Sequence, residues 1–170
     1  MATLTADNPR WIRSTVSAFL PQVAGALNVN ASATWKESEF LRLTSSGELK
    51  QCTSGAASGV AADAITHYAL FTETAALVST TTKVAPVSEN DIWEMNEKST
   101  TVTRAKIGLH YDLDVSSNVD TVNSGSSSHA VFEVVAPTWT ERPYQDDDAD
   151  TLARVLVRVL ATAVHAAPAS

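Results

Sequence analysis

Apolar and polar residues alternate along much of the chain, and this pattern predicts strands. The clearest run covers residues 108–115, where every second position is apolar: Leu109, Tyr111, Leu113 and Val115. Period-two alternation is typical of a strand with one buried face. Shorter runs bounded by turn residues give further strands at 39–43, 48–52, 78–84, 91–95 and 130–135. Many short strands with closely spaced turn signals predict a mainly β fold, either a small β-barrel or a sandwich.

The first 34 residues are less regular, and residues 8–20 predict a short helix. Asn8 and Pro9 are typical of a helix start. The apolar positions that follow fall on one helical face: Ile12, Val16, Phe19 and Leu20. We therefore divide the chain into an N-terminal arm with a short helix (1–34), a β-rich domain (35–165) and a disordered tail (166–170).

The arm could leave the body or pack against it, and the sequence leaves both readings open. Deleting residues 1–30 would distinguish between the two readings. A detached arm predicts a folded domain that no longer binds its partner, whereas unfolding would place the segment in the core.

Residues 151–165 fit two patterns. Leu152, Val155, Leu156 and Val159 share one helical face, but the valines at 155, 157 and 159 also alternate as in a strand. Periodicity alone does not decide between helix and strand here.

Charge and composition exclude several classes of protein. The formal net charge is -7, which disfavours binding to nucleic acid. No apolar run approaches the roughly 20 residues that span a bilayer, so we expect no membrane role. The N-terminus lacks a basic stretch followed by an apolar one, so we expect synthesis in the cytoplasm without a signal peptide. Cys52 is the single cysteine and excludes an internal disulfide.

The chain lacks the common sequence motifs of catalytic and phosphate-binding or dinucleotide-binding sites. It contains no G-x-S-x-G, no phosphate loop ending in Gly-Lys, no G-x-G-x-x-G and no H-E-x-x-H. The four histidines, at 67, 110, 129 and 165, lie too far apart for a helical zinc pair. We therefore expect a protein that is not an enzyme, with no catalytic residue, no cofactor and no metal.

One segment is a candidate for a calcium site, which would be an exception to that expectation. Asp112, Asp114 and Asp120 lie in a stretch whose oxygen side chains occupy alternate positions, as in an EF-hand loop. Ser117 stands where such a loop needs Gly, and Asn123 stands where it needs a bidentate Glu. A half-exposed strand running into a turn gives the same alternation.

Partner binding is the other candidate property. Aromatic residues carry much of the energy of interfaces, and Trp11 lies in the arm-like segment. We hypothesise that Trp11, Ile12, Phe19 and Leu20 contact a partner.

The order of motifs resembles a known family. It runs through FLRLTSSGEL (40–49), VAPV (84–87), DIWEM (91–95), IGLHYDL (107–113), VFEVV (131–135) and ARVLVRV (153–159). This order is similar to that of the small β-barrel structural proteins encoded near the major capsid gene of tailed bacteriophages, some of which decorate capsids. In such proteins the last stretch is a strand, so the resemblance favours a strand within 151–165.

The resemblance implies a capsid decoration, or cement, protein located on the virion surface. Its expected partners are the major capsid protein and further copies of itself, as a homotrimer or homodimer. Two alternatives stay open. One is a tail-tube or head–tail connector protein of the virion, and the other is a small β-barrel carbohydrate-binding module.

Overall fold

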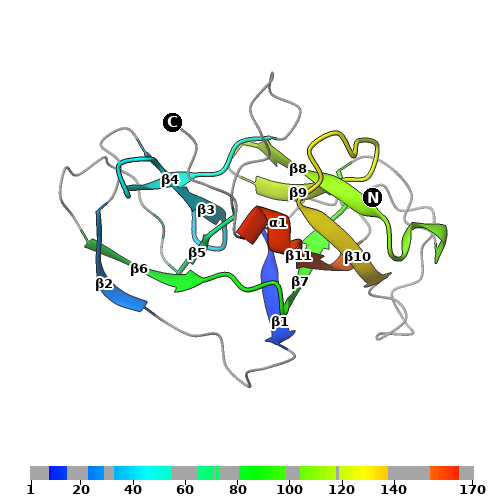
Figure 1. Ribbon diagram of the computed structural model, residues 1–170, viewed down its shortest axis with the longest axis horizontal. Helices are drawn as coiled ribbons and strands as arrows, with labels where there is room; N and C mark the ends of the chain where they lie inside the picture. Colours follow the sequence, from blue (N-terminus) through cyan, green and yellow to red (C-terminus); the bar gives the residue numbers. More distant parts are fainter. Residues whose placement is uncertain are drawn as a thin grey trace, which may run out of the picture.

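The computed structural model describes residues 8–14, 23–28, 33–54, 65–70, 72, 81–98, 104–117, 119–137 and 154–164. Within them the protein is mainly β, and its strands form two antiparallel sheets in a sandwich-like arrangement (Figure 1). None of the described helices is long and apolar enough to cross a membrane.

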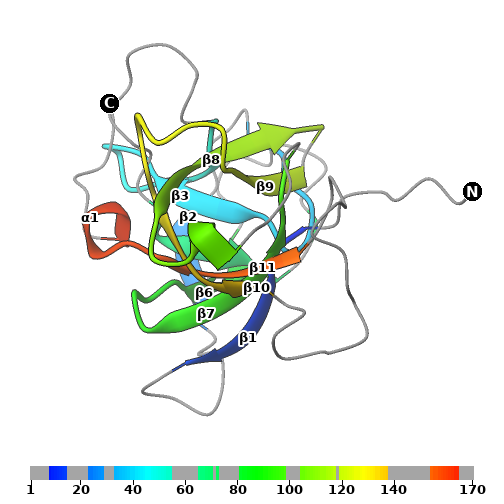
Figure 2. The same cartoon turned by 90° about the vertical axis from the view of Figure 1, so that its right-hand side faces the viewer.

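Sheet A has six strands in the order β1-β7-β11-β10-β8-β9. Their bounds are β1 (Arg10–Ser14), β7 (Asp91–Asn96), β8 (His110–Ser116), β9 (Val119–Asn123), β10 (Phe132–Pro137) and β11 (Arg154–Val159). The sheet curls strongly (Figure 2), so that β9 returns toward the end of β7. A single parallel bridge joins Glu97 to Val122, and the Lys98 N–H donates to the Val122 carbonyl at 2.9 Å. This contact falls short of a closed barrel.

Sheet B has five strands in the order β2-β6-β5-β3-β4. Their bounds are β2 (Val23–Asn28), β3 (Phe40–Leu43), β4 (Leu49–Gln51), β5 (His67–Ala69) and β6 (Thr81–Pro86). Gly47 allows the tight β3–β4 turn because its φ of 77° is costly for other residues. A short 3-10 helix, η1 (Arg104–Lys106), precedes β8, and α1 (Ala161–Val164) follows β11. The Ile65 N–H donates to the Ala163 carbonyl, so α1 lies beside the start of β5.

The main core lies between the two sheets. Phe40 from β3 and Tyr68 from β5 meet Trp93 from β7 and Phe132 from β10. The ring centroids of Phe40 and Trp93 lie 5.0 Å apart in an edge-to-face arrangement, which favours an aromatic pair. A second cluster, which includes Trp35, covers the opposite face of sheet B. The described parts of β3, β4, β5 and β6 therefore bury side chains on both faces of sheet B.

The helix predicted over residues 8–20 is wrong where the structure describes it. Residues Arg10–Ser14 form β1, which pairs with β7, while residues 15–20 lie outside the described residues. The strand conformation lets the backbone pair with β7 and places Trp11 against the main core. The two described strands of 1–34 thus pair within the sheets, since β2 also pairs with β6.

Most of the predicted strands are confirmed, with shifts of a few residues at their ends. The strand within 151–165 is confirmed as β11, followed by α1. Strands β2, β5 and β9 were not predicted, and β9 pairs with β8 in a hairpin. The predicted tail 166–170 lies outside the described residues.

Candidate functional site

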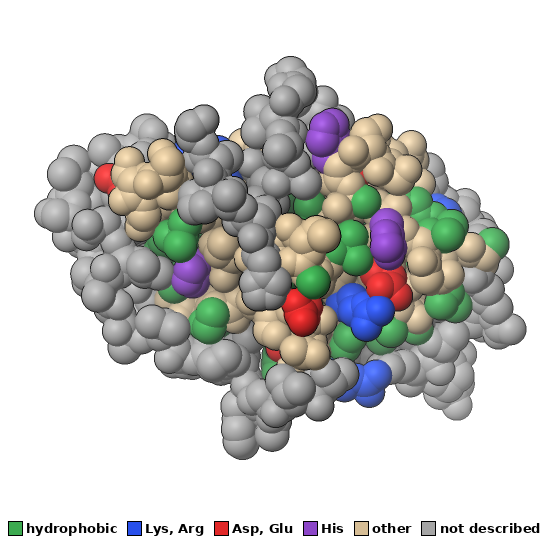
Figure 3. All heavy atoms as spheres, in the orientation of Figure 1, with side chains coloured by type: hydrophobic (Ala, Val, Ile, Leu, Met, Phe, Trp, Pro, Cys, Tyr) green, Lys and Arg blue, Asp and Glu red, His purple; other side chains and the backbone are tan. Residues whose placement is uncertain are grey.

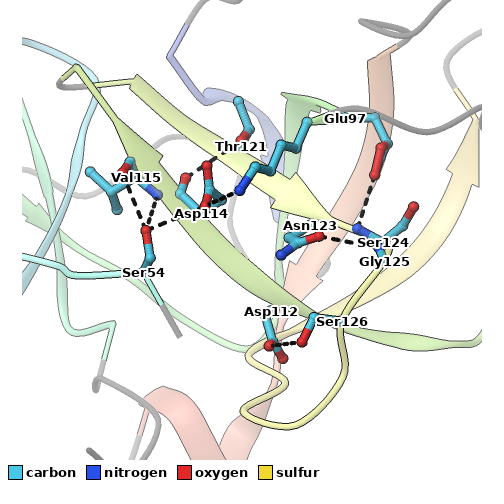
Figure 4. A network of polar contacts seen from close by, with 11 residues as sticks. Ser54, Glu97, Asp112, Asp114, Val115, Thr121, Asn123, Ser124, Gly125 and Ser126 are labelled. Atoms are coloured by element: carbon cyan, nitrogen blue, oxygen red, sulfur yellow. Dashed lines mark hydrogen bonds and ion pairs between the residues drawn. The ribbon is translucent and has the colours of Figure 1, made fainter. Parts of the chain in front are cut away.

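Buried carboxylates are a prominent feature of sheet A, and the β8–β9 hairpin holds three of them: Asp112, Asp114 and Asp120. Asp112 accepts from the Ser126 hydroxyl at 2.6 Å and from the His129 N–H at 2.9 Å, which fixes the loop after β9 (Figure 4). Asp114 accepts from the Lys98 ammonium at 2.6 Å. These two aspartates therefore tie neighbouring segments to the hairpin.

The hairpin register separates the three aspartates of the calcium candidate. Asp112 pairs with Asn123, Asp114 with Thr121, and Val115 with Asp120. Side chains alternate along a strand, so Asp112 and Asp114 share one face while Asp120 lies on the other. Among the described residues, no group of three or more His, Cys, Asp or Glu side chains could hold a metal ion. The segment forms a hairpin with its own hydrogen bonds rather than an ion-binding loop.

Asp120 meets a second buried carboxyl, that of Glu39, at the junction of the two sheets. Asp120 accepts from the Phe40 N–H at 2.6 Å, and Glu39 accepts from the Gln51 amide at 2.7 Å. The other oxygen of each carboxyl has no hydrogen-bond partner among the described residues. Burial raises the pKa of Asp120 well above its ordinary value of 3.8, the Phe40 N–H offsets part of this, and the charge of Glu39 raises the pKa further. The fold therefore favours a protonated Asp120.

Glu94 is the buried carboxylate of β7 on the outer face of sheet A. It lies between the guanidinium groups of Arg10 and Arg154, which come from the strands on either side of β7. The Arg10 contact helps to hold the edge strand β1 to β7, and the Arg154 contact links β7 to β11. Like the aspartates above, Glu94 serves the fold.

The residues hypothesised to bind a partner are only partly described. Trp11 is half-buried, packs on the main core and donates from its indole N–H to Asp91 at 3.3 Å. Ile12 lies at an irregularity of the β1–β7 register and is half-buried. Phe19 and Leu20 lie outside the described residues. The structure therefore gives Trp11 an internal role.

One row of side chains crosses the outer face of sheet A. The register aligns Arg13 of β1 with Ile92 of β7, Ile92 with Arg158 of β11, Arg158 with Glu133 of β10, and Glu133 with His110 of β8. Arg158 donates to one Glu133 oxygen from Nε at 2.9 Å and from Nη2 at 2.7 Å. His110 Nε2 lies 3.9 Å from the same oxygen. In Figure 3 side chains of both charges and a histidine gather on this face.

A cavity of about 600 Å³ opens along this row, and we call it the sheet A groove. Its size falls in the range of about 300–1,000 Å³ typical of binding pockets. Beside it stand the two large apolar side chains that are exposed among the described residues, Ile107 (43%) and Leu109 (49%). The lining comprises Arg13, Ser14, Ile92, Ile107, Gly108, Glu133, Val134, Val135 and Arg158. Among the described residues, the lining combines apolar surface with two guanidinium groups and one carboxylate.

Sequence reasoning did not single out the groove. In β11 the valines at 155, 157 and 159 lie in the core, so Arg154 and Arg158, which alternate with them, lie on the other face of the strand. Nothing in the sequence indicated that only β7 separates Arg158 from Arg13, because that depends on the pairing of β7 with both β1 and β11.

The described tryptophans do not form an aromatic platform of the kind that stacks on sugars. Trp35 and Trp93 are fully buried, and Trp11 packs on the core. Trp139 lies outside the described residues.

Comparisons with protein-family models, with curated proteins and with solved structures gave no match for this chain.

Proposed function

We propose that the chain is a structural protein of a tailed-bacteriophage virion that binds and stabilises the outside of the capsid. The resemblance in the order of its motifs supports this role, as does its mainly β, two-sheet fold. The contacts of Asp112, Asp114 and Glu94 also support it, because these buried carboxylates hold neighbouring segments of the fold together.

The observation that carries the proposal is the sheet A groove. It offers apolar and charged groups together on one face, which suits recognition of a protein surface. A decoration protein needs surface complementarity and no chemistry.

The affinity for the capsid increases when several linked copies of the protein bind it together. A homotrimer or homodimer at a local symmetry axis would present several grooves to several copies of the major capsid protein. Linked contacts of this kind can raise the overall affinity by about 10²–10⁴ without any new contact. Moderate affinity at each groove is therefore sufficient for stable decoration.

Co-sedimentation of the purified protein with capsids that lack it tests the proposal. We expect saturable binding at a fixed ratio to capsid subunits. The mass of the free protein in solution, measured in parallel, gives the assembly unit.

Two other results would contradict a cement role. Self-assembly into rings without capsid binding would favour a tail-tube or connector protein. A monomer that binds no capsid and is retained on an immobilised polysaccharide would favour a carbohydrate-binding module.

A further inference from the structure

We infer that the sheet A groove binds a polypeptide segment that presents a carboxylate beside aliphatic side chains. This inference deepens the proposed function and rests on it for the identity of the partner, which would be a segment of the capsid protein. The groove and the side chains that line it are features of the structure and do not depend on the proposed function.

The charge of the groove differs from that of the chain. The whole protein carries a net charge of -7, yet the described lining of the groove includes the guanidinium groups of Arg13 and Arg158 and one carboxylate, that of Glu133. An acidic segment is repelled by most of such a molecule and attracted at this place. Charge complementarity therefore selects both the partner and the position at which it docks.

The register allows both arginines to serve one bound segment. Arg13 and Arg158 flank Ile92 from the two neighbouring strands, which puts their backbones roughly 10 Å apart at the usual strand spacing. Arg158 uses Nε and Nη2 on Glu133, and a guanidinium carries five N–H donors in all. Glu133 thus orients Arg158 and also competes with an incoming carboxylate.

The apolar side of the groove accounts for the aliphatic part of the segment. Ile107 is 43% exposed and lines the cavity together with Val135. Gly108, with φ of 79°, turns the chain here, and its N–H donates to the Val134 carbonyl of β10 at 2.8 Å. The rim is therefore held in place by β10, and a partner's aliphatic side chains can cover the apolar surface that Ile107 exposes.

Nuclear magnetic resonance of the isotope-labelled full chain tests the inference. The probes are two short synthetic peptides of equal length, one alternating glutamate with valine and serine, the other with lysine in place of glutamate. We expect the glutamate peptide to shift the amide signals of Ile107, Gly108 and Val135 in a saturable way. The lysine peptide should leave them in place.

Charge variants sharpen this test. Arg158→Glu should weaken binding of the glutamate peptide about tenfold or more. Glu133→Gln should strengthen it a few-fold, since it removes the competing charge. Lys50→Glu makes the same charge change on β4 of sheet B and should leave binding unchanged. Arg13→Glu serves as a second variant if thermal melting shows that Arg158→Glu disturbs the fold.

Several results would overturn the inference: equal binding of both peptides, signal shifts that map away from the groove, or no effect of either arginine variant. Capsid co-sedimentation distinguishes a failure of this inference from a failure of the proposed function. If the arginine variants bind capsids as the wild type does, the groove is not the docking surface although the virion role stands. If the peptide binds and capsids do not, the groove stands and the virion role fails.

Discussion

At the scale of single residues, most of the buried carboxylates described above make contacts that hold the fold together. Asp112 holds the loop after β9, Asp114 holds Lys98, and Glu94 holds two arginines from neighbouring strands. Each of these carboxylates has partners that offset the cost of burial. Asp120 and Glu39 differ, because each keeps one buried oxygen without a partner among the described residues.

The buried pair predicts an unusual dependence of stability on pH. A carboxyl whose pKa is raised by folding binds more protons in the folded state than in the unfolded state. Stability is therefore full below the ordinary pKa of 3.8 and falls as pH rises from there toward the raised pKa of Asp120. Burial raises the pKa of Glu39 as well, which adds a contribution of the same sign.

Asp120→Asn tests this dependence. The asparagine oxygen can still accept from the Phe40 N–H, while the side chain no longer ionises. We expect the variant to gain stability relative to the wild type as pH rises above about 4. Urea denaturation followed by tryptophan fluorescence at a series of pH values measures this difference. Parallel curves for the two proteins would show that folding does not shift the pKa of Asp120.

At the scale of elements, β1 is the strand whose role changes most between sequence and structure. Its backbone pairs with β7, Trp11 packs on the core, and Arg10 contacts the buried Glu94. The segment therefore contributes to the body rather than standing apart from it. The same strand supplies Arg13 to the groove, so it joins stability to the proposed docking surface.

Removing residues 1–14 should destabilise the whole protein. The deletion exposes the edge of β7 and removes the packing of Trp11, which together should cost at least about 3 kcal/mol. Thermal unfolding followed by circular dichroism measures the loss. The control is Arg10→Ala, which keeps the strand and should cost about 1 kcal/mol, because Arg10 is half exposed and Arg154 still pairs with Glu94. If the deletion left the melting temperature unchanged, residues 1–14 would not contribute to the stability of the body, and the segment would be an arm.

At the scale of the whole molecule, the two sheets share one core. Phe40 of sheet B contacts Trp93 and Phe132 of sheet A, with centroid distances of 5.0 and 5.8 Å. The Phe40 N–H also binds Asp120 of β9. Contacts of this kind across the sheets predict that they unfold together.

Phe40→Ala tests the shared core. Truncating a fully buried phenylalanine should lower the free energy of unfolding by about 3–5 kcal/mol. We expect a single transition in urea at a lower midpoint. Leu43→Ala, at a half-buried position of the same strand, should cost less. Two separate transitions in the wild-type protein would show instead that the sheets fold independently.

The sequence by itself determined most of the strands and the fold class. The alternating run at 109–115 forms β8, although Asp112 and Asp114 on its polar face are buried as well, and the β-branched run of β11 forms a strand as the motif order favoured. These features are local, because alternation follows from the geometry of a single strand. Strand β9 escaped notice because its turn uses Ser117 with φ of 52° in place of the usual glycine signal.

Tertiary structure alone decided the rest. Whether residues 10–14 form a helix or a strand depended on β7 being available as a partner, which no local pattern records. The split of the candidate calcium aspartates onto two faces depended on the β8–β9 register. The row from Arg13 to His110 joins five strands that are distant in the chain, so its chemistry exists only once the pairing of those strands is fixed.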